Sequence, residues 1–155
     1  MLKSIEGNFD NPEVNELLTK HFIELREASP EGSAHVLDIP GLKVPTIKFW
    51  SLWDRENLIG CGALKFLDKE HGEFKSIRIH DNFRKKGKGI EVINHLIKEA
   101  KKLKIKRLSI ETGAGSYFTP ARKLFRKTGF TVCEPFAHYK EDINSVYLTM
   151  LIDDI

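Results

Sequence analysis

Hydrophobic residues recur at helical spacing in three stretches of the chain. Asn11-Pro12 is a typical helix start, with asparagine at the cap and proline at the first helical position. The hydrophobic face that follows comprises Val14, Leu17, Leu18, Phe22 and Leu25. The same spacing predicts a helix from about Gly89 to Leu103, with lysines on its outer face, and a shorter one over Pro120–Thr128, ended by Gly129.

Shorter hydrophobic runs bounded by polar turn sequences predict strands. The predicted strands are Leu2–Phe9, Thr46–Trp53, Leu58–Leu67, Gly72–His80, Arg107–Thr112, Phe130–Cys133 and Ser145–Ile152. Turns at 54–57 and 68–71 join three consecutive strands and indicate an antiparallel meander. Residues 28–45 are rich in Pro, Gly and Ser and predict a loop with one short helix near Ala34–Ile39. Strands followed by alternating strands and helices indicate a mixed α/β class.

Composition narrows the class of protein. The 155 residues are the size of one domain, expected to span 1–155, and 41% hydrophobic with 30% charged residues is typical of a globular chain. A net charge of +3 is too small for a nucleic-acid-binding coat. Cys61 and Cys133 form no CxxC pair and are expected to be buried free thiols in a reducing compartment, hence the cytoplasm. The first residues contain no hydrophobic run, so neither signal peptide nor membrane span is expected.

A basic, glycine-containing loop precedes the second helix. In FRKKGKGIEV, the cations are Arg84, Lys85, Lys86 and Lys88, and the glycines are Gly87 and Gly89. Glycine allows a tight turn and close approach of backbone N–H groups, and a helix N-terminus offers unpaired donors, so the loop predicts an anion site. A nucleotide triphosphate loop is excluded because GxxxxGK[ST] is lacking, and a Rossmann turn because Val92 stands where its third glycine is needed. A diphosphate held by backbone amides without metal fits best.

Other candidate chemistry is sparse in the sequence. The histidines show neither HExxH nor an i,i+4 pair, so no metal site is expected. Trp50 and Trp53 lie in a hydrophobic strand and are interpreted as core residues. The chain also lacks the basic face and aromatic signature expected of an RNA-binding protein.

The basic loop and its flanks resemble one known family. Arg84–Gly89, after a strand and before an amphipathic helix, resembles the acyl-CoA loop of the GNAT superfamily of N-acyltransferases. Lys106–Gly113 is similar to the fifth strand of that fold, and Pro120–Phe130 to its next helix and the Gly-Phe that follows. Stretches similar to a bacterial subgroup are Phe49-Trp50, Gly60–Leu64, His71–Glu73, Pro135-Phe136 and Asn144–Tyr147. The resemblance covers nearly the whole chain.

The resemblance implies a twisted, mixed, mostly antiparallel sheet of about seven strands, flanked by about four helices. This sheet is expected to splay open between the strands at 73–80 and 107–112, where the pantetheine arm of acetyl-CoA enters. The backbone of Ile77 and Ile79 is expected to pair with that arm, and the amides of Lys86 through Gly89 to hold the diphosphate. The side chains of Arg84, Lys85, Lys86 and Lys88 add charge, and those of Phe118, Ala121 and Phe125 complete the expected cosubstrate site.

The resemblance also implies that a primary amine of a small molecule attacks the thioester directly in a ternary complex. An alkylammonium has a pKa of about 10.4, so a base or a water chain must remove its proton. Glu73 and Glu111 are the candidate bases, and each is explained equally well as a solvent-facing carboxylate on a strand. An N–H near Ile79 is a candidate oxyanion donor. His35 and His138 fall in loops that border the acceptor pocket in this fold.

The chain departs from the family at its general acid. Phe125 stands where many members carry a tyrosine, and Phe118 where an asparagine is frequent. Tyr117 or Tyr139 is the alternative acid, unless a thiol of pKa about 8.5 leaves without one. Two functions remain: an acetyl-CoA-dependent N-acetyltransferase, and a non-catalytic acyl-CoA-binding or sensing module. The expected partners are acetyl-CoA and a small amine, without nucleic acid, metal or membrane, in a monomer or homodimer.

Overall fold

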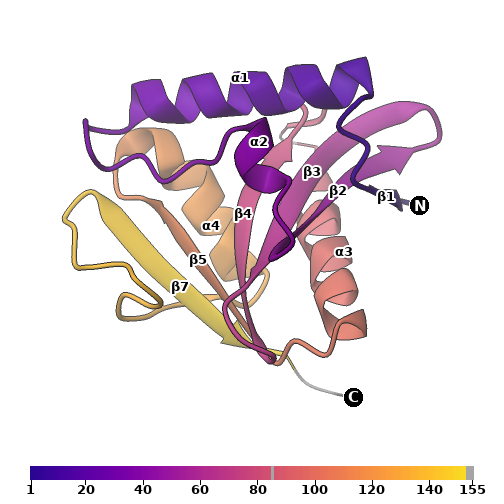
Figure 1. Ribbon diagram of the computed structural model, residues 1–155. Helices are drawn as coiled ribbons and strands as arrows, with labels where there is room; N and C mark the ends of the chain where they lie inside the picture. Colours follow the sequence, from indigo (N-terminus) through magenta and orange to yellow (C-terminus); the bar gives the residue numbers. More distant parts are fainter. Residues whose placement is uncertain (85, 153–155) are drawn as a thin grey trace.

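A seven-stranded mixed sheet forms the centre of the computed structural model, which describes residues 1–84 and 86–152 (Figure 1). Its strands are β1 (Lys3–Glu6), β2 (Ile47–Asp54), β3 (Asn57–Phe66), β4 (His71–Ile79), β5 (Arg107–Gly113), β6 (Thr131–Val132) and β7 (Ser145–Leu151). They lie in the order β1-β2-β3-β4-β5-β7-β6. The β4–β5 pair is parallel and the others are antiparallel. The mixed, mostly antiparallel sheet and the meander predicted from sequence are confirmed.

The helices begin where the local sequence favours them. They are α1 (Pro12–Ala28), α2 (Ile39–Leu42), α3 (Lys88–Lys102) and α4 (Thr119–Lys127), with 3-10 turns η1 (Asp81–Phe83) and η2 (Ser116–Phe118). Asn11 caps α1 by accepting hydrogen bonds from the amides of Glu13 and Val14, as predicted. The short helix expected near Ala34–Ile39 was placed wrongly. The helix starts after Asp38, whose carboxylate caps it by accepting a hydrogen bond from the Gly41 amide. Pro40 also favours this start, because proline is tolerated only in the first turn of a helix.

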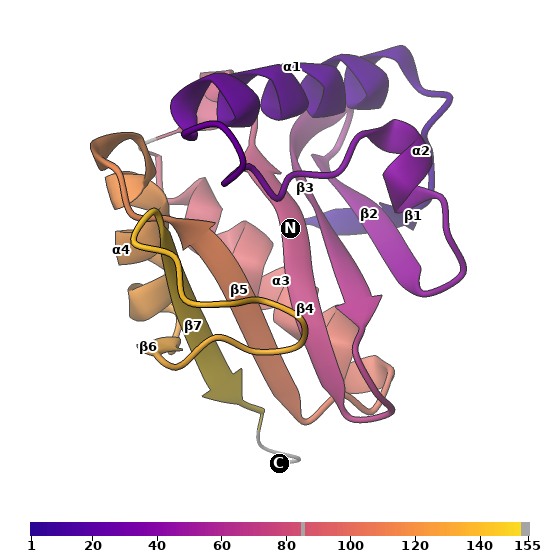
Figure 2. The same ribbon diagram turned by 60° about the vertical axis from the view of Figure 1, so that its left-hand side comes forward.

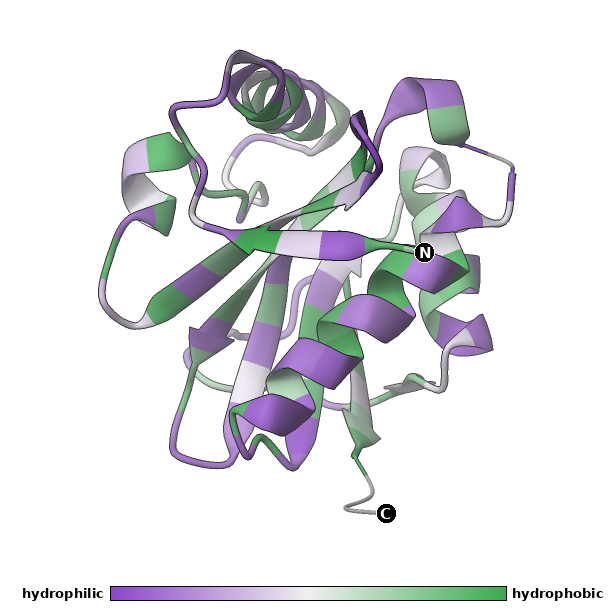
Figure 3. Cartoon of the chain, turned by 90° about the vertical axis from the view of Figure 1, so that its right-hand side faces the viewer, coloured by the Kyte–Doolittle hydropathy of each residue, from purple (hydrophilic) through white to green (hydrophobic). Residues whose placement is uncertain are grey.

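Helices cover both faces of the sheet. One core lies between the sheet and α3 with α4, and includes Leu64, Phe74, Val92, Leu96, Phe125 and Phe130. A second core joins α1 and α2 to β2 and β3, and includes Val14, Leu18, Leu42, Phe49 and Ala63. Figure 3 shows hydrophobic and hydrophilic stripes alternating along α3, which is the pattern of a helix with one buried side.

The sheet opens between β4 and β5. Their pairing comprises His71 with Arg107, Gly72 with Leu108 and Glu73 with Ser109. Beyond these pairs the two strands diverge toward their carboxyl ends, as Figure 2 shows. On its other side, β4 changes register with β3 between Cys61 and Ala63, and Ser76 in this bulge has a φ of 55°. The divergence therefore leaves unpaired backbone edges in the middle of the sheet, at the predicted position.

The two cysteines differ in burial. Cys61 is fully buried, and burial raises the pKa of its thiol to about 12. Cys133 is only partly buried, so its predicted burial was wrong. It follows the two-residue edge strand β6, where little packs over it. Trp50 lies in the core as predicted, whereas Trp53 is half-buried and donates to the Ser51 hydroxyl. Among the described residues, helices with the length and hydrophobicity to cross a bilayer are absent.

Candidate active site

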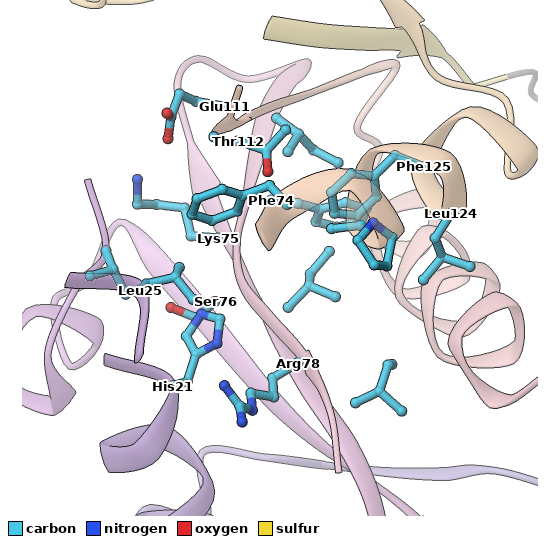
Figure 4. Close-up of a pocket in the computed structure, with 18 of the residues that line it drawn as sticks. His21, Leu25, Phe74, Lys75, Ser76, Arg78, Glu111, Thr112, Leu124 and Phe125 are labelled. Carbon is cyan, nitrogen blue, oxygen red and sulfur yellow. The ribbon is translucent and has the colours of Figure 1, made fainter. Parts of the chain in front are cut away.

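A cavity of about 690 Å³ occupies the opening between β4 and β5 (Figure 4). Its walls come from α1, the loop at 29–37, β4, β5, the start of α3, and α4. The predicted site residues on its walls are Glu73, Ile77, Ile79, Arg84, Gly87, Gly89, Glu111, Tyr117, Phe118, Ala121 and Phe125. One fold feature, the divergence of two parallel strands, thus gathers residues that are widely separated in the sequence.

The basic loop leads into the first turn of α3, where Gly87 and Gly89 are needed for different reasons. Gly87 caps α3 with a φ of 76°, a left-handed conformation that side-chain-bearing residues rarely adopt. A Cβ on Gly89 would lie 2.7 Å from Cδ2 of Leu124, so this glycine lets α3 pack against α4. The first amides of α3 lack helical acceptors and therefore remain available to a ligand.

The cations of this loop are mostly engaged within the protein. Lys88 pairs with Glu91 at 3.2 Å, and Arg84 pairs with Asp81 at 3.3 Å while donating to the Ile79 carbonyl at 3.4 Å. The Lys86 side chain is exposed, and Lys85 lies outside the described residues. Backbone donors at the helix start are therefore better placed to fix an anion than these side chains.

Glu73 is held in a buried hydrogen-bond network. Only 1% of the residue is exposed, which rules out a solvent-facing carboxylate. Oε2 accepts from the Tyr139 hydroxyl at 2.6 Å and lies 3.3 Å from Nζ of Lys75, which also donates to that hydroxyl at 3.1 Å. Oε1 has no hydrogen-bond partner within the part of the chain that the structure describes. Burial and the neighbouring Glu73 raise the pKa of Tyr139 above its ordinary range, so its hydroxyl remains a donor.

Glu111 lies on β5, across the opening from β4. Its Oε2 accepts from the Ser145 hydroxyl at 2.8 Å, and burial raises the pKa of the carboxyl group. Both candidate bases therefore face one cavity. Glu111 is only partly buried, whereas Glu73 keeps a wholly buried, unpartnered oxygen.

Aromatic side chains form the wall contributed by η2 and α4. Phe125 is 6% exposed and packs edge-to-face on Phe130, with 6.0 Å between the ring centroids. The Phe118 ring fills the space beside Gly113. A Cβ added to Gly113 would lie 2.1 Å from Cδ2 of this ring. Tyr117, 43% exposed, packs against Phe118 at the rim. Tyr139, the other alternative acid, donates its hydroxyl hydrogen bond to Glu73.

Several wall residues were missed by sequence reasoning. They are His21, Lys75, Ser76 and Arg78. Arg78 is 3% exposed, and its Nη2 donates to Glu24 at 2.7 Å and to Asp81 at 3.3 Å. The sequence signal for this residue was a charged side chain, Arg78, between two isoleucines of a predicted strand. His35 also lies on the wall, whereas His138 is exposed and stacks on Tyr139. Groups of three or more metal-ligating side chains are not found among the described residues.

Comparisons with known proteins agree with this geometry. A model described as "Acetyltransferase (GNAT) family" matches residues 11–130. The uncharacterized N-acetyltransferase YsnE of Bacillus subtilis (strain 168) is 47% identical over 137 residues, covering 88% of this chain and 91% of the relative. The uncharacterized N-acetyltransferase YedL of Escherichia coli (strain K12) is 40% identical, covering 92% and 89%. A GNAT family acetyltransferase from Elizabethkingia anophelis, solved with acetyl-CoA bound, has a TM-score of 0.69 at 21% identity, covering 97% and 98%.

Proposed function

The chain belongs to the acetyltransferase (GNAT) family and is an N-acetyltransferase, and we propose that it transfers the acetyl group of acetyl-CoA to a primary amine of a small molecule. The names of the two relatives favour turnover over a binding-only module. The acetyl-CoA in the structure of similar fold supports the choice of donor. The amine attacks the thioester directly, with both substrates in the cavity.

The pantetheine arm occupies the opening beside β4. His80 donates its amide to the Ile59 carbonyl of β3 at 2.7 Å. Because backbone donors alternate in direction along a strand, the Ile79 N–H points away from β3 and into the opening. There it binds the arm or the carbonyl oxygen that becomes the oxyanion, and the backbone of Ile77 extends the same edge. The diphosphate lies on the amides of Lys86 through Gly89 at the α3 start.

The buried Glu73 carboxylate, with one unpartnered oxygen, is the observation that carries this proposal. The amine arrives as an ammonium, and Glu73 accepts its proton directly or through one water. The nitrogen then attacks the carbonyl carbon, the C–S bond breaks, CoA leaves as a thiolate, and the new amide nitrogen loses its second proton to solvent water. Phe125 supplies no proton, so Tyr117 protonates the thiolate or the thiolate departs unaided, since its pKa is about 8.5.

Thiol release measured against a panel of primary amines tests the proposal. A Glu73→Gln variant is expected to lose about 10²- to 10⁴-fold in kcat at full acetyl-CoA occupancy. Glu111→Gln is the matched control across the opening and is expected to lose much less. Tight acetyl-CoA binding by calorimetry, without thiol release for any amine, would instead support the non-catalytic module.

A further inference from the structure

Three polar side chains between α1 and β4 carry hydrogen-bonding atoms that have no partner among the residues the structure describes. They are Nδ1 of His21, Oγ of Ser76, and Nε and Nη1 of Arg78. His21 and Arg78 are 6% and 3% exposed, and all three residues line the cavity. In Figure 4 the His21 ring is drawn between the Ser76 hydroxyl and the Arg78 guanidinium. Buried polar groups in proteins are normally satisfied, so this cluster indicates a polar group of a ligand.

Within residues 1–84 and 86–152, the ion pairs around the cluster contain one more cation than carboxylates. Asp81 is shared with Lys20 and Arg84, and Glu24 pairs with Arg78 alone. The cations are Lys20, Arg78 and Arg84, and the carboxylates are Glu24 and Asp81. Because only Nη2 of Arg78 reaches these carboxylates, the other nitrogens of the guanidinium remain for an anion.

His21 adds a neutral acceptor or donor rather than a charge. Burial, and then the charge of Arg78, lower the pKa of His21 to about 3. The ring is therefore uncharged at neutral pH. An anion bound beside it would counteract the charge of Arg78 and raise that pKa, which provides a measurable signature of occupancy.

On the premise of the proposed amine acetylation, we propose that the acceptor is an amine that also bears a carboxylate, as an amino acid does, and that Arg78 and Ser76 bind this carboxylate. The carboxylate then meets the charge of Arg78, and the amine lies beside it along β4, from where its proton reaches Glu73 through water. Leu25, Ala34, Val36 and Leu37 line the same cavity and suit an apolar acceptor side chain.

Matched acceptors test the proposal. Leucine, methionine and phenylalanine are each compared with the corresponding amide, which has the same side chain but no carboxylate. The amides have less basic amines, so intrinsic reactivity favours them. A kcat/KM at least about tenfold higher for the acids is therefore the expected result, since charge-assisted hydrogen bonds give about 10- to 100-fold. A preference for the amides would overturn the proposal.

Two variants separate the carboxylate site from other roles. Arg78→Lys keeps a cation for Glu24 but removes the forked donor, and Ser76→Ala removes only the hydroxyl. Both are expected to lower the ratio of kcat/KM for the acids to kcat/KM for the amides, Arg78→Lys by about 10- to 100-fold. Equal losses for acids and amides, or a raised KM for acetyl-CoA alone, would refute carboxylate binding.

A readout without turnover distinguishes failure of this inference from failure of the proposed function. NMR titration of the His21 ring, assigned by loss of its signals in His21→Gln, is recorded on CoA-bound protein with leucine or leucinamide. Leucine, and not leucinamide, is expected to raise the pKa of His21. That result in a protein without transferase activity would keep the carboxylate site and reject the reaction. Equal titration curves with both compounds would reject the site.

Discussion

Tyr139→Phe removes the shortest hydrogen bond to the proposed base. The Tyr139 hydroxyl donates to Oε2 of Glu73 at 2.6 Å, and Lys75 at 3.3 Å is the other partner of that oxygen. A hydrogen bond to a charged group contributes about 1.5–3 kcal/mol, and about 1.4 kcal/mol corresponds to a tenfold change in rate. Without this donor the carboxylate is positioned by Lys75 alone among the described residues, so kcat is expected to fall by about 10- to 100-fold. The KM for acetyl-CoA is expected to be unchanged.

Tyr147→Phe is the matched control, because its hydroxyl donates to the Lys140 carbonyl at 2.7 Å and not to Glu73. Its kcat is expected to be unchanged. The rate is measured by thiol release with one amine at saturating acetyl-CoA. An unchanged kcat in Tyr139→Phe, or equal losses in both variants, would refute the assignment of Glu73 as the base oriented by Tyr139.

Three further changes are predicted. Gly89→Asp and Gly89→Asn displace Leu124 equally, but only Asp places an anion beside the diphosphate. Calorimetry should therefore show acetyl-CoA binding at least about tenfold weaker for the Asp variant than for the Asn variant. Equal affinities would show that the diphosphate does not bind at this loop. Phe125→Tyr should fold normally and raise kcat by at most about 10²-fold, because the ring borders the cavity; a lower Tm without faster turnover would contradict this. Because the folded protein keeps His21 neutral to about pH 3 while the unfolded chain binds a proton below about pH 6.5, stability should fall on acidification, by about 2 kcal/mol at pH 5, in urea unfolding; a His21→Gln variant should lack this component.

Local signals in the sequence were sufficient for most of the secondary structure. Asn11-Pro12 determines where α1 begins, and Gly87 and Gly89 mark the start of α3, because capping depends on neighbouring residues. The order of polar turns also fixed the meander of β2, β3 and β4. The α2 helix was misplaced because four residues are too few to carry a periodic signal.

Partners far apart in the chain explain what sequence reasoning missed at the site. Tyr139 and Glu73 are 66 positions apart, and Arg78 and Glu24 are 54 apart, so neither pair leaves a local pattern. The bulge at Ser76 likewise arises from pairing with β3. The family resemblance anticipated the opening of the sheet, whereas the network that holds the base depends on the loop at 134–144, whose packing only the structure gives.

The short contact between β4 and β5 also links the amount of folded protein to metabolic supply. These strands pair over three residues, so their inner edges are completed only when a ligand fills the opening. A ligand that binds only the folded chain stabilises it by about 2.7 kcal/mol at one hundred times its Kd. Cells rich in the cosubstrate would thus retain more of the protein against proteolysis. Substitutions in the opening would lower abundance as well as rate, so activity in extracts should be normalised to folded protein.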